Sequence, residues 1–333
     1  MQDVVGQPLE ASRGILAGSR LVSLILYVND LAASKSFYGD TLGLRLIEED
    51  DDSAKYDTGQ TLLCLNRASD HGVTLASPDH SADMTFLVDD LDGVRDELER
   101  AGVEFSETLR YEIGATVNFY DPDGHWLSLY EPSKMAMTWP SGDKIRAILK
   151  AGGNGAASQG SNGDPLAASS GGDARGPRLG GRELIYLFLF VPDADLAFDF
   201  YHTVLGLNYM ECRPCRRGST GNERGVVKYD GGGLMLTTHH FDGACPATSA
   251  PRQLTTAQMK GIAPVFHVTD LDQQIENLAQ AAIPSGAVSR TEAGSMASFE
   301  DPFGRAFYLY EPSKDTLGTP TGAKISEIMV ARL

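Results

Sequence analysis

Short apolar segments alternate with amphipathic helical stretches along the first half of the chain. Residues 21–28 and 84–88 are largely apolar runs, which predicts two buried strands. An aspartate follows each run, Asp30 or Asp90, and either residue can cap the N-terminus of the helix that comes next. Further short strands are predicted at 44–48 and 61–65 after the first helix, and at 116–120 and 126–130 after the second. The pattern therefore predicts two βαβββ units in succession.

The second half of the chain repeats this pattern with closely matching residues. Four pairs of segments carry the repeat: 26–30 with 189–193, 55–57 with 228–230, 121–124 with 301–304, and 129–134 with 309–314. The last pair is identical letter for letter. Similarity of this kind indicates an internal duplication. The chain is therefore predicted to hold four βαβββ units in two copies.

The repeat also predicts where the domains lie. A length of 333 residues suggests about two domains, which we place at 21–150 and 183–333. Residues 151–182 contain ten glycines and only two leucines, a composition typical of a flexible linker. Residues 1–20 are predicted to be a weakly structured lead-in. We expect each copy to form one eight-stranded α+β domain, and the two domains to pack on each other as a pseudo-dimer.

Composition narrows the range of partners. A net charge of -17 argues against nucleic acid and anionic membranes as partners. No apolar run approaches the roughly 20 residues that span a bilayer, and the first residues lack the pattern of a signal peptide. We therefore expect a cytoplasmic protein whose partner is a small molecule.

Three cysteines raise the question of zinc. Cys212 and Cys215 have the CxxC spacing of a zinc knuckle, and Cys245 and His239-His240 follow. However, no second CxxC occurs, and Cys212 to Cys215 falls in a ten-residue insertion of the second copy. We favour an ordinary loop here, with zinc as the alternative.

The order of these motifs resembles the vicinal-oxygen-chelate superfamily, which includes glyoxalase I, bleomycin-resistance proteins and extradiol dioxygenases. The resemblance is carried by a strand ending in Val-x-Asp, a helix with Phe-Tyr, a Leu-Gly-Leu segment, and an Asp-Pro-x-Gly turn before an apolar strand. These motifs occur twice and cover about 260 of the 333 residues. The resemblance implies paired βαβββ units that curl into an incomplete barrel around a small-molecule site. In enzymes of the family, His, Glu or Gln residues on four strands hold a divalent metal.

The positions that the resemblance implies for metal ligands hold other residue types. They fall at Ser23, Cys64, Asp83 and Ser128 in the first copy, and at Tyr186, a residue of 234–239, Ala263 and Tyr308 in the second. In the segment 234–239 only His239 could bind a metal. Whether each copy builds its own site or the copies exchange units, no set gathers three good donors. We therefore expect no metal cofactor, with Fe, Zn, Ni or Mn as the alternative.

A tyrosine-lined cleft is predicted instead. Residues two apart on a strand share a face, which joins Tyr308 to Tyr310, Ser128 to Tyr130, and Ala263 to His267. Tyrosines suit a planar ligand through stacking and one hydroxyl. The candidate ligand-binding residues are Tyr308, Tyr310, His267, Tyr186, Asp83, Ser128, Tyr130 and Ser23. We expect His125 to lie in a solvated loop, and Glu131 and Glu311 to share a structural role at a strand end.

Three functions fit this fold, because the fold alone does not decide among them. The first is a metal-independent binder of small planar molecules, of the drug-sequestering or resistance type. The second is a metal-dependent lyase, isomerase or ring-cleaving dioxygenase with ligands drawn from Asp83, Cys64, His239 and His267. The third is a structural or partner module whose cleft is filled. No catalytic residue is assigned.

Overall fold

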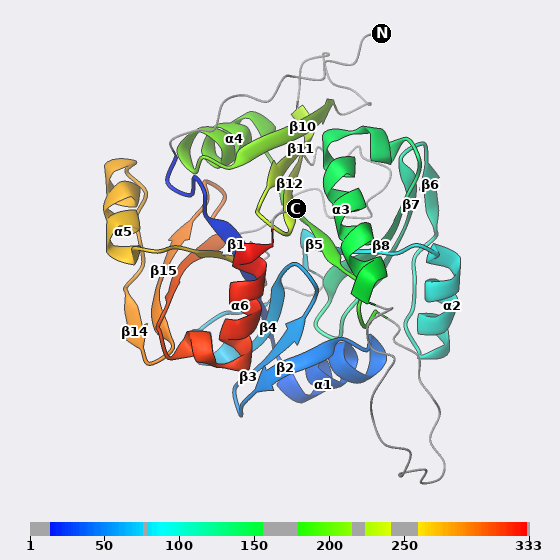
Figure 1. The fold of residues 1–333 in the computed structure, drawn as a ribbon, viewed down its shortest axis with the longest axis horizontal. Coiled ribbons are helices and arrows are strands. Elements are labelled where there is room, and N and C mark those ends of the chain that lie inside the picture. Colours follow the sequence, from blue (N-terminus) through cyan, green and yellow to red (C-terminus); the bar gives the residue numbers. More distant parts are fainter. Residues whose placement is uncertain (1–13, 76–78, 156–178, 215–223, 241–258, 332–333) are drawn as a thin grey trace.

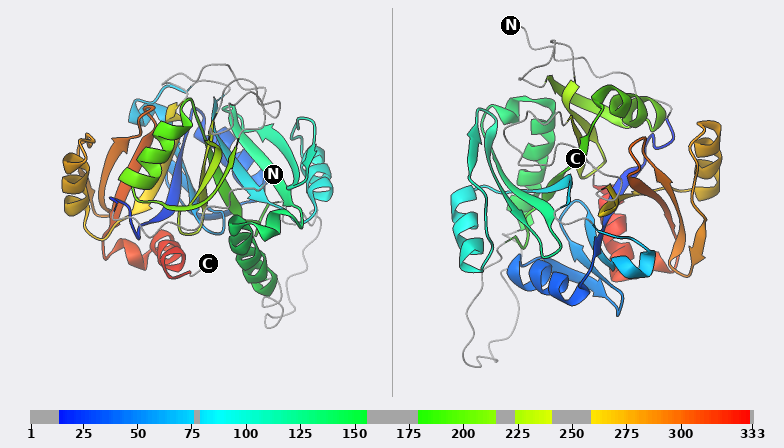
Figure 2. Two further views of the ribbon diagram at one scale, coloured as in Figure 1. Left: turned by 90° about the horizontal axis from the view of Figure 1, so that it is seen from above. Right: turned by 180° about the vertical axis from the view of Figure 1, so that it is seen from behind.

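The computed structural model describes residues 14–75, 79–155, 179–214, 224–240 and 259–331. Two curled eight-stranded sheets lie side by side, with the helices α2 and α5 at opposite outer ends (Figures 1 and 2). The α-helices are α1 (Leu31–Lys35), α2 (Leu91–Arg100), α3 (Pro140–Gly155), α4 (Ala194–Phe198), α5 (Leu271–Gln280) and α6 (Pro320–Val330). The α+β fold of paired βαβββ units is thus confirmed. No helix among the described residues has the length and apolar character needed to cross a membrane.

The first sheet has the strand order β14-β15-β16-β13-β1-β4-β3-β2. Its strands are β1 (Arg20–Val28), β2 (Arg45–Glu49), β3 (Ser53–Asp57), β4 (Leu62–Arg67), β13 (Ile262–His267), β14 (Ser289–Thr291), β15 (Gly294–Glu300) and β16 (Ala306–Pro312). The second sheet has the order β10-β11-β12-β9-β5-β8-β7-β6. Its strands are β5 (Asp79–Leu87), β6 (Leu109–Tyr111), β7 (Gly114–Tyr120), β8 (His125–Pro132), β9 (Leu184–Val191), β10 (Asn208–Pro214), β11 (Arg224–Asp230) and β12 (Met235–His240).

The two copies exchange halves. β1 pairs antiparallel with β13, and β5 pairs antiparallel with β9, so each sheet joins one unit from each copy. The expectation that each copy forms its own eight-stranded domain is therefore wrong, and the limits 21–150 and 183–333 describe copies in the sequence rather than the sheets. The physical reason is that the strands of the two copies carry the same apolar pattern. A pattern of this kind fixes which face is buried, but not which of two equivalent edges becomes the partner.

The helix starts follow the predicted capping chemistry. Asp30 accepts hydrogen bonds from the backbone N–H groups of the first turn of α1, and Asp90 accepts one from Gly93 in α2. Glu131 accepts a 2.9 Å hydrogen bond from the backbone N–H of Leu91, and Glu311 accepts the equivalent 2.9 Å bond from Leu271. The shared structural role predicted for the two glutamates is thus confirmed. Each ties a strand end to the start of a helix.

The lead-in and the linker are shorter than predicted. The backbone N–H of Leu16 donates a 2.6 Å hydrogen bond to the carbonyl of Leu205, and the N–H of Leu179 donates a 2.8 Å bond to the carbonyl of Leu42. Leu16 and Leu179 are both buried. Helix α3 also continues to Gly155, into the segment predicted to be irregular. The apolar side chains of Leu16 and Leu179 pack against helix ends, and a count of the glycines in the two segments does not reveal this packing. The middle of the predicted linker lies outside the described residues.

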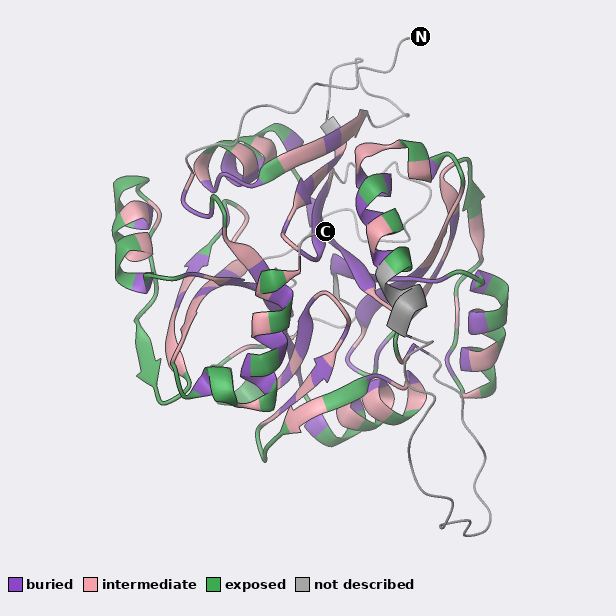
Figure 3. Ribbon diagram, in the orientation of Figure 1, coloured by how far each residue is buried: buried purple, intermediate pink, exposed green. Residues whose placement is uncertain are grey.

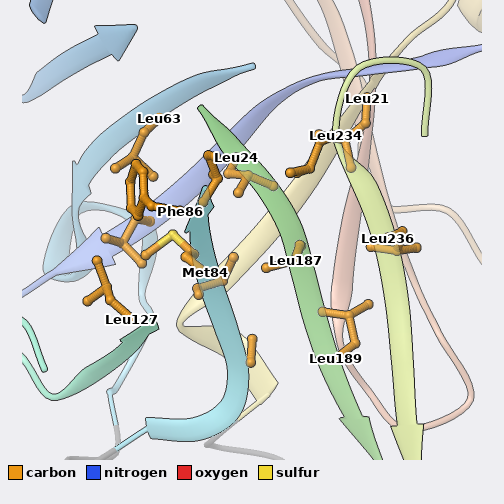
Figure 4. Close-up of a cluster of buried hydrophobic side chains, with 14 of the residues drawn as sticks. Leu21, Leu24, Leu63, Met84, Phe86, Leu127, Leu187, Leu189, Leu234 and Leu236 are labelled. Atoms are coloured by element: carbon orange, nitrogen blue, oxygen red, sulfur yellow. The ribbon is translucent and has the colours of Figure 1, made fainter. Parts of the chain in front are cut away.

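Apolar side chains from both sheets and both copies form a common core. Figure 4 shows this cluster, which includes Leu24 of β1, Leu63 of β4, Met84 and Phe86 of β5, and Leu187 of β9. The central strands β1, β9 and β13 are largely buried, whereas the edge strands β2 and β14 and one side of the helices are exposed to solvent (Figure 3). Because the core is shared, the exchange of halves is held by apolar burial as well as by strand pairing.

Two polar side chains that follow the turn glycines bridge the sheets. His125 is 1% exposed, and its Nε2 lies 2.8 Å from the carbonyl oxygen of Tyr27. The expectation of a solvated loop histidine is therefore wrong, because the turn faces the neighbouring sheet and not solvent. Arg305 takes the same position in the second copy, and its guanidinium donates to the carbonyls of Ser81 and Phe190 at 2.9 and 3.3 Å.

Candidate functional site

A cavity of about 230 Å³ lies on the second sheet. Asp83 and Thr85 of β5 line it and alternate with Met84 and Phe86, which face the shared core. The cavity therefore lies on the opposite face of the sheet from the core. Aromatic side chains make much of the wall: Tyr111, Trp126, Tyr130, Tyr186, Phe188 and Phe190.

The aromatic rings hold one another in place. Trp126 and Phe190 are stacked, with ring centroids 5.3 Å apart and an interplanar angle of 12°. Tyr186 contacts both Tyr130 and Phe188, with centroid distances of 6.1 and 5.5 Å. Walls of this kind offer flat apolar surface to a planar molecule, and a few polar groups then fix its orientation.

Asp83 is the acidic group of the cavity. Its carboxylate oxygen Oδ2 accepts hydrogen bonds from Ser128 Oγ at 2.7 Å and from Thr85 Oγ1 at 3.4 Å. Its Oδ1 is buried without a hydrogen-bond partner among the described residues. Burial raises the pKa of the Asp83 carboxyl to about 7, although the two hydroxyl hydrogen bonds oppose this rise. The group therefore titrates near neutral pH.

A cluster of polar groups from both copies lies at the other side of the cavity. Lys228 Nζ forms a 2.9 Å ion pair with Glu211 and donates to Ser141 Oγ and to the Tyr186 hydroxyl, each at 3.0 Å. The first sheet has the equivalent cluster of Lys55, Glu48 and Thr321. In the first sheet the residue at the position of Tyr186 is Ser23, so the cluster does not depend on a tyrosine. Its role in both sheets is to hold a helix against the sheet, α3 in the second sheet and α6 in the first. In the second sheet it also orients Tyr186.

The two tyrosine hydroxyls of the cavity differ in whether they can still donate a hydrogen bond to a ligand. The Tyr130 hydroxyl donates to the carbonyl of Ile113 at 2.7 Å, so its hydrogen is in use. The Tyr186 hydroxyl accepts from Lys228, so its own hydrogen remains available to a ligand. Arg213, which also lines the cavity, has its guanidinium carbon 3.6 Å from the centroid of the Trp139 ring.

The exchange of halves separates the predicted site residues into two groups. Asp83, Ser128, Tyr130 and Tyr186 come together on the second sheet, where Ser128 supports Asp83 and the other three line the cavity. Ser23, His267, Tyr308 and Tyr310 belong to the first sheet. The roles assigned to these residues stay predictions.

On the first sheet the residues of the equivalent face contact one another. The Tyr308 hydroxyl lies 3.0 Å from that of Tyr27, and the Tyr310 hydroxyl donates to the carbonyl of Ala293 at 2.6 Å. Val73 and Leu75, which follow β4, pack in the same apolar cluster as these two tyrosines. Ser23 Oγ lies 3.1 Å from Cys64 Sγ. These contacts lie on the face that the tyrosines were predicted to open to a ligand.

His267 lies at the end of β13 on the first sheet and is partly buried. Burial lowers the pKa of its imidazole, while the nearby charge of Glu311 acts in the opposite direction. A neutral imidazole is therefore favoured at neutral pH. Glu311 already accepts a hydrogen bond from the backbone N–H of Leu271, and this hydrogen bond helps to fix the start of α5.

The donor set of the cavity does not fit the metal that the superfamily resemblance implies. Among the described residues, no group of three or more His, Cys, Asp or Glu side chains is placed to hold a metal ion. Asp83 and His239 both line the cavity, but Cys64 and His267 belong to the first sheet and cannot join them. A stable site wants three or four convergent donors. Cys212 is partly buried, and Cys215 and Cys245 lie outside the described residues.

Several residues of the cavity were not predicted. Phe188 and Phe190 share a strand face with Tyr186, so the alternation of β9 carries a signal for them. Trp126 precedes Ser128 by two residues and follows from the same rule. Arg213 and Lys228 come from the opposite edge of the sheet, and only the curl of the sheet brings them to the cavity.

Comparison with known proteins gives one matching family and several similar folds. The model of the Glyoxalase/Bleomycin resistance protein/Dioxygenase superfamily matches residues 20–129. The chain is 32% identical over 125 residues to the protein YraH of Bacillus subtilis, a match that covers 34% of this chain and 98% of YraH.

Several solved structures match nearly the whole chain. A putative dioxygenase from Bacillus subtilis superposes with a TM-score of 0.56 at 14% identity, covering 94% of this chain and 91% of the other. Glyoxalase I from Zea mays superposes with a TM-score of 0.54 at 14% identity, covering 93% and 95%. At this identity the likeness shows the fold alone.

Proposed function

The chain belongs to the glyoxalase/bleomycin resistance protein/dioxygenase superfamily, and we propose that within it this protein binds a small planar aromatic molecule without a metal ion. The observation that carries the proposal is the aromatic cavity of the second sheet with Asp83 in its wall. An apolar cavity of about 150 Å³ is enough to hold benzene. A cavity of about 230 Å³ therefore has room for a larger aromatic ligand.

The two sheets support different roles. The second sheet offers an apolar space with a few oriented polar groups, which is the usual form of a small-molecule site. On the first sheet, Val73 and Leu75 pack against the equivalent face, which fits the reading of a filled cleft. We assign binding to the second sheet and a supporting role to the first.

A second candidate function is proton-transfer catalysis of the isomerase or lyase type, with Asp83 as the acid or base. It is favoured by one observation, the carboxyl pKa of about 7 at the wall of the cavity. A group that titrates near the working pH is well suited to general acid–base catalysis. Turnover of a bound compound that is lost in Asp83→Asn would establish it, whereas binding without turnover supports the first function.

Ligand binding is tested by a thermal-shift screen of planar aromatic compounds, followed by calorimetric titration. A bound compound raises the melting temperature by mass action. Phe188→Ala should then weaken binding by about 1–2 kcal/mol, because the variant removes one aromatic wall of the cavity. Tyr308→Ala, on the packed face of the first sheet, is the matched control and should leave the affinity unchanged. The reverse result would move the site to the first sheet.

Metal content is tested by dialysis against zinc, nickel, iron or manganese, followed by elemental analysis. We expect well under one equivalent of any of them to be retained at the cavity, because it gathers too few donors. Stoichiometric metal that disappears in Asp83→Ala or His239→Ala would contradict the proposal. Metal that disappears only in Cys212→Ser would point to the CxxC segment and leave the cavity metal-free.

A further inference from the structure

We infer that the ligand of the second-sheet cavity is a two-ring aromatic molecule with an N–H or O–H donor at one end and an acidic group at the other. The inference rests on the proposed function, since it names the class of ligand that the same cavity takes. The observations that support it are the unused hydrogen-bonding atoms of Asp83, Tyr186 and Arg213, and the volume of the cavity that these residues line.

The donor requirement comes from the hydrogen bonds around Asp83. Ser128 Oγ lies 2.7 Å from Asp83 Oδ2 and 2.9 Å from Asn118 Oδ1, but a serine has only one hydrogen to donate. With a neutral carboxyl, Asp83 Oδ2 donates to Ser128, which donates to Asn118. With an ionised carboxyl, Ser128 donates to Asp83, and a flipped Asn118 amide donates to Ser128.

With the proton on Oδ2, or with an ionised carboxyl, Asp83 Oδ1 is an acceptor that has no donor among the described residues. A buried acceptor of this kind destabilises the protein while it stays unsatisfied. A ligand that brings an N–H or O–H group to Asp83 recovers this free energy. A ligand that offers only an acceptor leaves the oxygen unsatisfied or adds repulsion, so the cavity discriminates against it.

The acidic end comes from Arg213 and from the Tyr186 hydroxyl, which also line the cavity. The charge of Lys228 is already neutralised by Glu211, and its hydrogen bond to Tyr186 leaves the tyrosine hydrogen free. Arg213 stacks on Trp139, and its Nε is buried without a hydrogen-bond partner among the described residues. A guanidinium and a free hydroxyl hydrogen that line the same cavity are suited to a carboxylate or another acidic group.

The two ends are separated by the sheet itself. Asp83 lies on β5, whereas Arg213 lies on β10, and β11, β12 and β9 come between them. The aromatic rings of Phe188 and Tyr186 on β9 line the space between. With a volume of about 230 Å³, against about 150 Å³ for a benzene-sized cavity, a fused two-ring system is the fitting core.

Four naphthalene derivatives test this inference by calorimetric titration of the full chain. They are a hydroxynaphthoate with its substituents on opposite rings, its methyl ether, naphthol and methoxynaphthalene. The hydroxynaphthoate should bind about tenfold more tightly than its methyl ether, which lacks the donor, and about tenfold more tightly than naphthol, which lacks the acid. Methoxynaphthalene should bind most weakly.

Variants assign each preference to its residue. Asp83→Ala should abolish the preference for the hydroxyl over the methyl ether, and Asp83→Asn, which keeps an acceptor oxygen, should retain it. Arg213→Gln should abolish the preference for the acid over naphthol. Arg290→Gln is the control with the same charge change, because Arg290 pairs with Asp272 on the first sheet, 2.6 Å away. It should change neither preference.

The outcomes distinguish a failure of the inferred ligand class from a failure of the proposed function. If the four compounds bind with equal affinity, the cavity is a planar-ligand site but the inferred ligand class is wrong. If none binds, the proposed function fails together with the ligand class. If Asp83→Asn loses the hydroxyl preference as fully as Asp83→Ala, the recognition depends on the charge of the carboxylate, and the acceptor argument is overturned.

Discussion

Asp83→Asn is expected to make the protein more stable at pH 8, by about 2–4 kcal/mol. Burial raises the pKa of the Asp83 carboxyl to about 7 in the folded protein, whereas an unfolded aspartate has a pKa of about 3.9. Between these two values the folded state binds a proton that the unfolded state does not. Stability therefore falls as the pH rises from about 4 to about 7, and stays low above that. Asparagine has no charge to bury, so the loss should not occur.

The measurement is thermal or urea unfolding of the natural protein and the variant from pH 4 to pH 8. Near pH 4 the two should be equally stable, and the advantage of Asp83→Asn should grow up to about pH 7. Asp92→Asn removes an exposed aspartate that pairs with Arg110 at 2.7 Å, and it serves as the control without burial. If Asp83→Asn gave no gain at any pH, the carboxyl would have to be hydrated in the folded protein.

A buried acid that weakens the fold is typical of a residue kept for function. The stabilised Asp83→Asn protein is therefore also a useful reagent. It should retain the hydrogen-bond acceptor for a ligand and lose the group that titrates near neutral pH. Binding and proton transfer can be separated in this one variant.

Asp301→Ala is expected to lower the stability of the protein by about 3–5 kcal/mol. Asp301 Oδ2 lies 3.2 Å from Arg305 Nη1 and accepts a 2.7 Å hydrogen bond from the Tyr201 hydroxyl. Arg305 is fully buried, with 0% of its surface exposed. Alanine would leave the guanidinium charge inside the protein without its carboxylate, which is the costly way to break a buried ion pair.

The first copy supplies the matched comparison. Asp121 accepts a 2.9 Å hydrogen bond from the Tyr38 hydroxyl, but its neighbour at the position of Arg305 is His125. Histidine can be neutral, so Asp121→Ala should cost less than Asp301→Ala in urea unfolding. Adding Arg305→Met to Asp301→Ala should restore part of the loss. Equal losses in the two single variants would show that the buried charge of Arg305 is not the cause.

The apolar pattern predicted the units of this fold but not their partners. The strands and the caps at Asp30 and Asp90 depend on residues close in sequence, which is why they could be predicted. The role of Glu131 could be predicted because Glu311 repeats it in the second copy. The pairing of β1 with β13 depends on a choice between two edges with the same pattern. His125 was misplaced for a related reason, since only the packing of the sheets buries it.

The sequence predicted several residues of the candidate site but not how they come together. Strand alternation and the family resemblance pointed to Asp83, Ser128, Tyr130 and Tyr186, but in two separate sets. The exchange of halves brought the two sets to one sheet. Arg213 and the hydrogen-bond capacity left at Tyr186 depend on three-dimensional neighbours and leave no local signal in the chain.

The exchange of halves also decides how the protein can fold while it is being synthesised. β1 ends at Val28, and its partner β13 begins at Ile262, about 230 residues later. At roughly 5–20 residues per second, a ribosome needs on the order of 10–50 s to supply that partner. During this time the first copy presents an open strand edge at β1, and the edge of β5 stays open until β9 has been made. Such edges can pair with the wrong chain. Yield should therefore depend on translation speed and temperature more strongly than for a chain whose strands pair with near neighbours.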